Sequence, residues 1–379
     1  MKCRRLMLVF LCICMLTGCI ETHVLERLSI MVAIGYDGLE DDKIRVTANF
    51  LESQPDAKEH NRTATVDSYT SKGARIKLNE QLPFKVATGQ VRSVLFDKKM
   101  IDYKMLNEID VLSRDPTYGD VIYIALVDGT AEELLSHPYK NIPNVGMFLN
   151  SLFEHNMKYS WLPSTTLHEF TRCRNREMAE LVVPIIKLDK DEIKITGLAL
   201  FNEDRLAGEA TPNEAYYIKA LTTGAKEYLY ESLIKSEELK QSAMKPYFKY
   251  ELTKTNVKFI FEILRSNASI HLVNPESKEF NVDVKIDIDI HEISERYLFD
   301  KPGAKDALKE QLDRELTKDL QTLLDRLREL NTDSIGFGEY YRSKVRHSDA
   351  ASKLWEKEFP NTKLNAHVSI DIVRTGTLE

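Results

Sequence analysis

The sequence predicts a multidomain α+β protein with mixed sheets and packed helices. Its 379 residues are 43% hydrophobic and 29% charged, an ordinary globular composition with enough length for two or three domains. Segments with strand and helix patterns follow one another without regular βαβ alternation. In the C-terminal third, strands with alternating polarity precede a long amphipathic helix, which indicates a domain of antiparallel-type strands covered by that helix.

The first twenty residues have the pattern of a targeting segment. Three basic residues among the first five positions precede an uncharged apolar run over 6–20, which is short for a spanning helix and typical of a signal peptide. The run ends in Leu16-Thr17-Gly18-Cys19, the apolar, small, small, cysteine order of a bacterial lipobox. We therefore expect residues 1–18 to be removed as a lipoprotein signal peptide and Cys19 to carry the lipid, with palmitate among its acyl chains. The alternative is an uncleaved signal anchor in which Cys19 is an ordinary apolar residue.

The expected lipid anchor determines where the rest of the chain lies, which we call the body. Two acyl chains attach a protein stably to a membrane, so we expect the body at the outer surface of the cytoplasmic membrane. Of the five cysteines, three lie in the signal peptide and Cys19 is lipidated, so Cys173 has no intramolecular disulfide partner. The chain has 52 Lys and Arg against 59 Asp and Glu, a net charge of -7, and lacks the basic character that nucleic-acid binding requires.

The N-terminal half predicts strands mixed with helices. The expected strands are a hairpin, a weaker strand and a buried apolar strand, at 28–36 with 43–51, 61–70 and 120–127. Helices are expected over 72–82 and 102–113, each ending ahead of a proline because the residue before proline disfavours the α region. Two more helix starts are indicated by capping boxes, at Thr130 with Glu133 and at Thr166 with Glu169.

The domain boundary is expected just after a strand at 180–188. Pro184 suggests that this strand is an edge strand or that it ends there, because proline cannot donate to a sheet ladder. We place the boundary in the following turn, which gives domains at 19–189 and 190–379, with a further split near 240 as an alternative. Beyond the turn, the sequence predicts a hairpin, a helix and a stretch that fits either strand or helix, at 193–201 with 205–211, 213–223 and 225–250.

The C-terminal third has the clearest periodicity. Apolar and polar residues alternate over 282–290, so this strand has one buried and one solvated face, and 256–272 is its expected partner. A leucine stripe with spacings of three and four predicts an amphipathic helix over 305–330 that packs on the sheet. A second helix is expected from Tyr340 to about Glu358, and a final strand over 366–373.

No enzymatic motif is found in the sequence. It contains no GxSxG, HExxH, P-loop or CxxC pattern, and its histidines are not spaced as metal ligands on a helix. Arg172 and Arg174 flank Cys173 and could lower the pKa of its thiol to make a nucleophile, but a fortuitous thiol is the favoured interpretation. We therefore predict that the protein is not an enzyme, has no catalytic residue and uses no cofactor.

Two surfaces have alternative interpretations. Asp283, Asp287 and Asp289 with His291 could hold a cation, but such residues on one strand face normally form its solvated side. The leucine stripe could bind a partner, although packing against its own sheet is favoured. We expect no metal site, and the sequence assigns no ligand-binding residue.

A series of short motifs runs in order along nearly the whole chain. They are Ile34-Gly35-Tyr36-Asp37, Ser113-Arg114-Asp115-Pro116, Val183-Pro184-Ile185-Ile186, Thr196-Gly197-Leu198-Ala199-Leu200-Phe201, Asp204-Arg205-Leu206-Ala207-Gly208, Ile335-Gly336-Phe337-Gly338 and Arg374-Thr375-Gly376. Together with the lipobox, they resemble the Ger(x)C lipoproteins, the C subunits of spore germination receptors. Each motif is short, and their order and spacing carry the resemblance.

The resemblance implies a function and a location. It implies a subunit of a nutrient germinant receptor in the inner membrane of the spore, with two integral-membrane partners, the A-type and B-type subunits, and no catalytic activity of its own. The motif glycines and prolines have a simpler explanation as turn and packing residues. The alternative function is a solute-binding lipoprotein of a transporter, which would need two α/β lobes that the order of elements does not supply.

Overall fold

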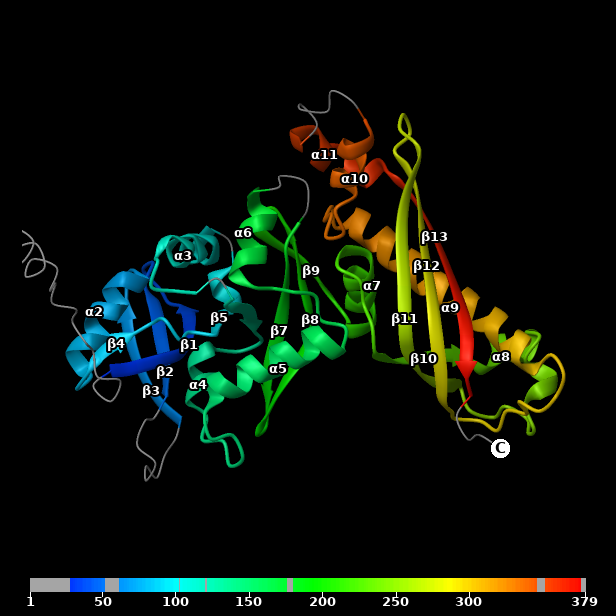
Figure 1. Ribbon diagram of the computed structural model, residues 1–379, viewed down its shortest axis with the longest axis horizontal. Coiled ribbons are helices and arrows are strands. Elements are labelled where there is room, and N and C mark those ends of the chain that lie inside the picture. The colour runs from blue at the N-terminus through cyan, green and yellow to red at the C-terminus, as the bar shows by residue number, and fades with distance from the viewer. Residues whose placement is uncertain are drawn as a thin grey trace, which may run out of the picture.

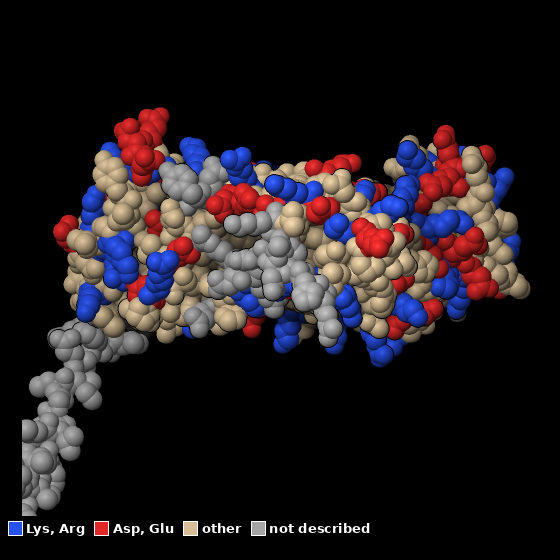
Figure 2. Space-filling model, turned by 90° about the horizontal axis from the view of Figure 1, so that it is seen from above, with Lys and Arg blue, Asp and Glu red and all other residues tan. Residues whose placement is uncertain are grey.

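Two β-sheets lie one after the other along the long axis of the molecule (Figure 1). The computed structural model describes residues 28–51, 61–101, 103–119, 121–175, 180–345 and 352–375. The first sheet comes from the N-terminal part of the chain and the second from the C-terminal part. Lys and Arg lie among Asp and Glu over most of the face shown in Figure 2. The predicted multidomain α+β class is confirmed.

The larger sheet has a parallel centre with an antiparallel extension on each side. Its strands in spatial order are β3 (Asn61–Ser68), β2 (Ile44–Leu51), β1 (Leu28–Gly38), β5 (Ser93–Asp97), β6 (Tyr123–Val127), β7 (Val182–Asp189), β8 (Glu192–Asn202) and β9 (Arg205–Ala210). β1, β5, β6 and β7 run parallel, and the short strand β4 (Lys85–Ala87) also pairs in parallel with the start of β1. Every residue of β5 and β6 is buried, as expected for a parallel sheet covered on both faces.

Helices cover both faces of the larger sheet. One face carries α2 (Ser71–Gln81), α3 (Tyr103–Arg114) and α6 (Leu167–Asn175), with a 3-10 turn η2 (Lys98–Met100) after β5. The other face carries α4 (Ala131–Ser136), α5 (Val145–Tyr159) and α7 (Pro212–Thr222). The apolar side chains of the two faces belong to two separate clusters, because successive residues of a strand point to opposite faces.

Helix α7 connects the larger sheet to the second sheet. Its start is defined by a complete capping box between Thr211 and Glu214 and by Pro212 at the first helical position. All residues from 215 to 221 are buried, so the helix is enclosed on every side. It contacts β8 and β9 of the larger sheet and β11 (Asn256–Asn274) of the second.

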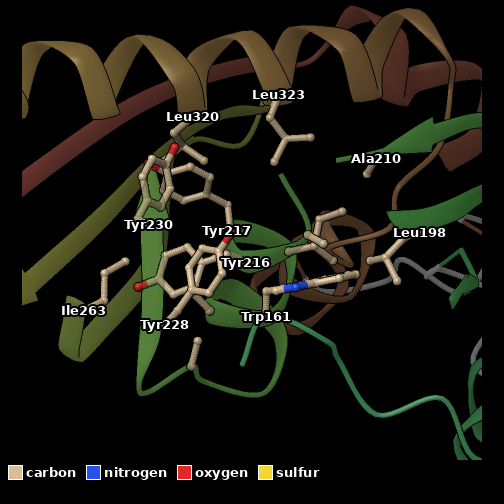
Figure 3. Close-up of a cluster of buried hydrophobic side chains, with 14 of the residues drawn as sticks. Trp161, Leu198, Ala210, Tyr216, Tyr217, Tyr228, Tyr230, Ile263, Leu320 and Leu323 are labelled. Carbon is tan, nitrogen blue, oxygen red and sulfur yellow. The ribbon is translucent and has the colours of Figure 1, made fainter. Parts of the chain in front are cut away.

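Four tyrosines form the packed contact around α7 (Figure 3). Tyr216 and Tyr217 come from the helix, and Tyr228 and Tyr230 come from the first strand of the second sheet. The rings of Tyr216 and Tyr228 stack with their centroids 5.2 Å apart, and Tyr230 stacks on Phe261 at the same distance. One hydrophobic cluster therefore extends from α4 and α5 through α7 into the second sheet.

The second sheet has four strands and one long covering helix. Its strands in spatial order are β10 (Tyr228–Lys235), β11, β12 (Glu279–Ile293) and β13 (Lys363–Arg374). The remaining elements are α8 (Ser236–Gln241), η3 (Lys245–Tyr247), α9 (Ala304–Glu329), α10 (Phe337–Lys344), α11 (Ser352–Glu358) and η5 (Phe359–Asn361). The first three strands are antiparallel as predicted, whereas β13 runs parallel to β12.

Helix α9 packs its leucine stripe on the sheet. The exposed fraction is 0% for Leu308, Leu312, Leu316, Leu320, Leu323 and Leu327. Its main partner is β13, and its side chains bond to that strand's backbone: Thr317 Oγ1 accepts from Val368 N at 2.9 Å and Asp313 accepts from Ile370 N at 2.7 Å. The stripe is therefore core and not a free partner surface.

Several predicted elements differ from the observed ones. The ambiguous stretch 225–250 divides into β10, α8 and η3. The single helix expected over 340–358 is wrong, because α10 ends at Lys344 with Val345 in an extended conformation, and α11 is a separate helix. Pro184 does not lie on an edge strand, since β7 pairs with β6 and β8; the ladder with β6 begins at Ile185, after the proline. Helix α5 was not predicted.

The expected domain division falls inside the larger sheet. The turn after Asp189 connects β7 to β8, and both strands belong to that sheet. The alternative split near 240 falls in α8, which follows β10 of the second sheet. The boundary at 189/190 therefore does not separate the two sheets, which lie on either side of α7. As a division into domains, it stays a prediction.

Candidate functional site

A pocket of about 370 Å³ lies beside α7, between the larger sheet and the segment that leads into α10. It is lined by residues just before and within α6, by the start of β7, by the end of α7 and by the segment that leads into α10. We name it the junction pocket. Its apolar lining includes Ile124, Phe170, Val183, Ile218, Leu221 and Ile335. The rest of the lining is largely polar and includes Ser, Thr, Glu and Arg side chains, so the pocket is mixed in character. A concave site of this size is the usual form of a small-molecule site.

Thr165 and Glu180 are two polar residues of the junction pocket whose side chains are shielded from water. Thr165 is only 6% exposed, and its hydroxyl has no hydrogen-bond partner among the described residues. The Glu180 carboxylate accepts from Glu203 N at 3.0 Å. Burial raises the pKa of Glu180 to about 7, and the charges of Asp333, Glu356 and Glu203 add to this effect. The pocket therefore offers a buried hydroxyl and a carboxyl that changes charge near neutral pH.

Cys173 lies on α6 and lines the same pocket, half-buried. Arg172, one of the two arginines expected to activate it, binds the Glu169 carboxylate instead, with Nε 2.7 Å from Oε2. This pairing offsets the positive charge next to the thiol, so the structure provides less reason than the sequence to regard Cys173 as a nucleophile.

One wall of the junction pocket is held by the buried carboxylate of Asp333, which is 4% exposed. It accepts hydrogen bonds from the backbone N–H groups of Gly336, Phe337 and Gly338 and from Trp355 Nε1, each at 2.8 Å. These bonds satisfy the first turn of α10 and connect it to α11. The Asp333 backbone carbonyl also accepts from Glu180 N at 3.0 Å, which joins this loop to the larger sheet.

The glycines of this loop are required by its geometry. Gly336 has a φ of +89°, which favours glycine, and a Cβ on Gly338 would lie 2.7 Å from Trp355 Nε1. Burial raises the pKa of Asp333 to about 6, although its four donors act in the opposite direction. The motif Ile335-Gly336-Phe337-Gly338 thus serves to close the loop around a buried carboxylate.

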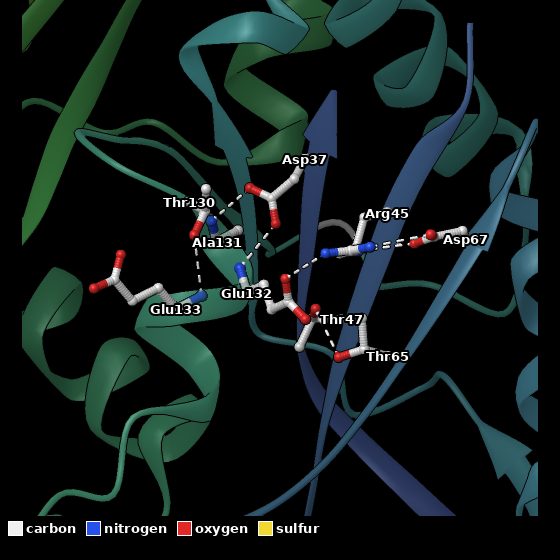
Figure 4. A network of polar contacts seen from close by, with 9 residues as sticks. All are labelled: Asp37, Arg45, Thr47, Thr65, Asp67, Thr130, Ala131, Glu132 and Glu133. Carbon is white, nitrogen blue, oxygen red and sulfur yellow. Dashed lines mark hydrogen bonds and ion pairs between the residues drawn. The ribbon is translucent and has the colours of Figure 1, made fainter. Parts of the chain in front are cut away.

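Asp37 has the same role at the opposite end of the chain (Figure 4). Its carboxylate accepts from Ala131 N at 2.6 Å and Glu132 N at 2.8 Å, at the start of α4. Burial raises the pKa of Asp37 to about 6. A Cβ on Gly35 would lie 2.5 Å from the Ala131 Cβ, so α4 can approach β1 only over a glycine.

Arg45 extends this network across the sheet (Figure 4). Its Nη1 lies 2.9 Å from Glu132 Oε2, and its Nε lies 2.8 Å from Asp67 Oδ1, so it bridges α4 and β3. The motifs at Asp37 and Asp333 are therefore explained by contacts that the fold itself requires. This agrees with the simpler interpretation of the motif residues as turn and packing residues.

The acidic strand residues do not converge on a cation site. Asp283 lies opposite Ser269 and Asp287 opposite Arg265, while His291 Nε2 is 3.5 Å from Glu262 Oε2. Within the described ranges, no group of three or more His, Cys, Asp or Glu side chains is placed to hold a metal ion. This face of β12 is its solvated side.

Cys19, the predicted lipidation site, lies outside the described residues, as does the rest of 1–27. Among the helices that the structure describes, none is both long enough and apolar enough to cross a membrane.

Sequence reasoning did not find Thr165 and Glu180, because the lining of the junction pocket comes from positions between 124 and 343 that only the fold brings together. The role of Asp333 could have been recognised from the sequence. An aspartate followed by glycines at the third and fifth positions after it, ahead of a helix, has the pattern of a capping loop.

Two family models match consecutive parts of the chain. One is described as "Spore germination protein N-terminal domain" and matches residues 21–188. The other is described as "Spore germination B3/ GerAC like, C-terminal" and matches residues 196–376. Together they account for almost all of the described residues.

Similar proteins cover most of the chain. "Spore germination protein GerQC" of Bacillus cereus is 21% identical over 364 residues, which are 96% of this chain and 96% of that protein. "Putative spore germination protein YfkR" of Bacillus subtilis (strain 168) is 22% identical and covers 82% of this chain and 77% of its own length. The solved structure titled "Crystal Structure of the GerBC protein" has a TM-score of 0.53 at 17% identity, and the match covers 92% of this chain and all of that one. At this identity, the structural match shows a shared fold.

Proposed function

The chain belongs to the Ger(x)C family of spore germination receptor C subunits, and on that premise we propose that it acts as the lipid-anchored subunit of a nutrient germinant receptor. Cys19 carries the lipid after removal of residues 1–18. The body lies on the exported side of the inner membrane of the spore. It takes part in triggering germination by binding two integral-membrane subunits, of the A and B types.

One observation supports this proposal more than any other. Both family models match, in order, and a curated relative described as a spore germination protein aligns over 96% of both chains. A shared fold alone would leave the function open. A match to both consecutive models supports a common role for the whole chain.

The arrangement of the two sheets suits a subunit that acts through binding. Helix α7 is buried between them, so a contact made on one half is transmitted to the other through packed side chains. We propose that the protein has no catalytic step and no cofactor. The alternative, a solute-binding lipoprotein, requires two similar α/β lobes, whereas the described residues form a sheet of nine strands and one of four.

The anchor is tested by metabolic labelling with palmitate in a spore-forming host. We expect label in the wild-type chain and none in Cys19→Ala, which should accumulate as an unprocessed precursor. Cys173→Ala is the matched control, since it removes a thiol of the body and should retain the label. A labelled and processed Cys19→Ala chain would show that the lipid is attached elsewhere or that the lipobox is not used.

A further inference from the structure

The point where the chain enters the fold limits how far the body can lie from the membrane. Leu28 begins β1 and pairs with Lys85 of β4, beside α2, at the end of the molecule away from the second sheet (Figure 1). Eight residues lie between Cys19 and Leu28. Even fully extended, they span at most about 30 Å. If Cys19 is lipidated, as the proposed function holds, this end of the larger sheet lies close to the bilayer.

One segment at this end is basic. Residues 69–92 contain five Lys or Arg and a single acidic residue, Glu80, although the whole chain has a net charge of -7. In Figure 2, Lys and Arg side chains lie over this end of the molecule beside Asp and Glu side chains. A membrane surface rich in anionic lipid attracts such a cluster, and the attraction acts within about one Debye length.

The outer side of α2 also exposes apolar groups. The helix buries Ala74 and Leu78 against the sheet, while Ile76 is 62% exposed. Tyr69 just before the helix is 66% exposed, and Phe84 just after it is 40% exposed. Bulky apolar side chains among lysines are typical of a surface that lies in the headgroup region of a membrane.

Some of these basic side chains have partners within the fold. Lys72 and Arg75 contact the buried Asp115, and Lys77 Nζ donates to the Asp67 carbonyl at 2.6 Å. Lys77 and Lys85 form no salt bridge with any described residue, although the charge of Lys77 helps to lower the pKa of Asp67. Unlike Lys72 and Arg75, they hold no buried carboxylate in place, so they are the residues to change.

We propose that this face contacts anionic lipid headgroups beside the anchor. We name it the α2 face and define it as Tyr69, Lys72, Ile76, Lys77, Phe84 and Lys85; the exposed Glu80 lies one helical turn from Ile76 on the same side. The proposal rests on the lipid anchor of the proposed function. It orients the protein with the larger sheet on the bilayer and the second sheet farther from it.

Thiol accessibility tests the proposal on the full lipidated chain. Ile76→Cys is introduced in a Cys173→Ala background and labelled with a charged maleimide on vesicles of phosphatidylcholine alone or mixed with phosphatidylglycerol. Leu233→Cys is the matched control, because Leu233 is 56% exposed and lies on β10 of the second sheet. We expect phosphatidylglycerol to slow labelling severalfold at Ile76→Cys, to leave Leu233→Cys unchanged, and to lose its effect at high salt.

Charge reversal provides a second measurement. Lys77→Glu with Lys85→Glu should restore the labelling rate at Ile76→Cys, whereas reversal of Lys285 and Lys363, exposed residues of the second sheet, should not. Equal labelling rates on the two kinds of vesicle would overturn the proposal. Protection that needs the integral-membrane subunits would also overturn it and identify a protein interface.

The same vesicles distinguish a failure of the α2-face proposal from a failure of the lipid-anchor proposal. Flotation with phosphatidylcholine vesicles at high salt reports the anchor alone. A chain that floats but shows no protection at Ile76→Cys retains the anchor and contradicts the α2 face. If the chain does not float, the anchor is absent, and the α2 face is then judged by whether phosphatidylglycerol at low salt makes the chain float.

Discussion

Replacing Asp333 by alanine should strongly destabilise the protein. The carboxylate is 4% exposed and accepts four hydrogen bonds of 2.8 Å, three from backbone N–H groups and one from Trp355 Nε1. Each buried donor left without a partner costs about 1–3 kcal/mol. Gly336 N also donates to the Asp333 backbone carbonyl at 3.2 Å and keeps that partner, so three donors lose theirs. Even at the lower limit, the loss is about 3 kcal/mol, a large part of a domain stability of about 5–15 kcal/mol.

Urea unfolding followed by circular dichroism measures this loss. Asp333→Asn keeps the shape and one acceptor oxygen, so it should fall between the wild type and Asp333→Ala. Asp371→Ala is the control, because that side chain is 82% exposed and its removal should change the free energy of unfolding by less than about 0.5 kcal/mol. A loss below about 1 kcal/mol for Asp333→Ala would refute the view that this carboxylate holds the loop.

Three further substitutions test other parts of the fold. Leu316→Ala should lower the free energy of unfolding by about 2–5 kcal/mol in urea because Leu316 is fully buried, whereas Glu310→Ala removes an exposed ion pair with a contribution of about 0.2–0.5 kcal/mol. Gly197→Ala should lower the melting temperature, because its Cβ would lie 2.2 Å from the Ala210 carbonyl oxygen and force β8 and β9 apart. Lys219→Met should change how the free energy of unfolding depends on pH. Burial lowers the pKa of Lys219 from 10.5 to about 8 in the folded protein. Between these two pH values, the unfolded chain therefore holds a proton that the folded chain does not. The wild type should therefore gain about 3 kcal/mol relative to the variant as pH rises from 8 to 10.5, measured by unfolding at several pH values.

Each of these has a result that contradicts it. An unchanged free energy of unfolding for Leu316→Ala, together with impaired assembly of the receptor, would make the leucine stripe an interface. Gly89→Ala is the control for Gly197→Ala, since a Cβ there would be 3.6 Å from its nearest neighbour. Equal losses for both would disprove the steric explanation. Parallel pH profiles of wild type and Lys219→Met would show that Lys219 has an ordinary pKa in the folded state.

Elements with strong periodicity were predictable from the sequence. The stripe of α9 and the alternation of β12 repeat over many residues, so each fixes both the element and its buried face. The apolar run of β6 also identified a strand covered on both faces, and every residue of it is buried. These features depend on local pattern alone.

Features that depend on long-range pairing were not predictable. Strand β5 has no distinctive pattern of its own, yet it is central to the larger sheet because β1 and β6 pair with it. The parallel pairing of β13 with β12 depends on the path of the chain through α9 to α11. The junction pocket has the same origin, since its lining residues are far apart in sequence.

Pro184 shows why a local rule can mislead. The rule that proline avoids interior strands is about hydrogen bonds, and β7 meets it by pairing with β6 only from Ile185 onward. The position of a proline within a ladder therefore matters more than the position of its strand within the sheet.

Co-purification from spore membranes tests the central claim most directly. The chain is tagged at its C-terminus, expressed during sporulation and isolated from detergent-solubilised inner membranes, and its partners are identified by mass spectrometry. We predict that two integral-membrane subunits co-purify with the wild-type chain and that Cys19→Ala reduces their recovery. Recovery of a transporter permease and ATPase in their place would contradict the account and support the solute-binding alternative.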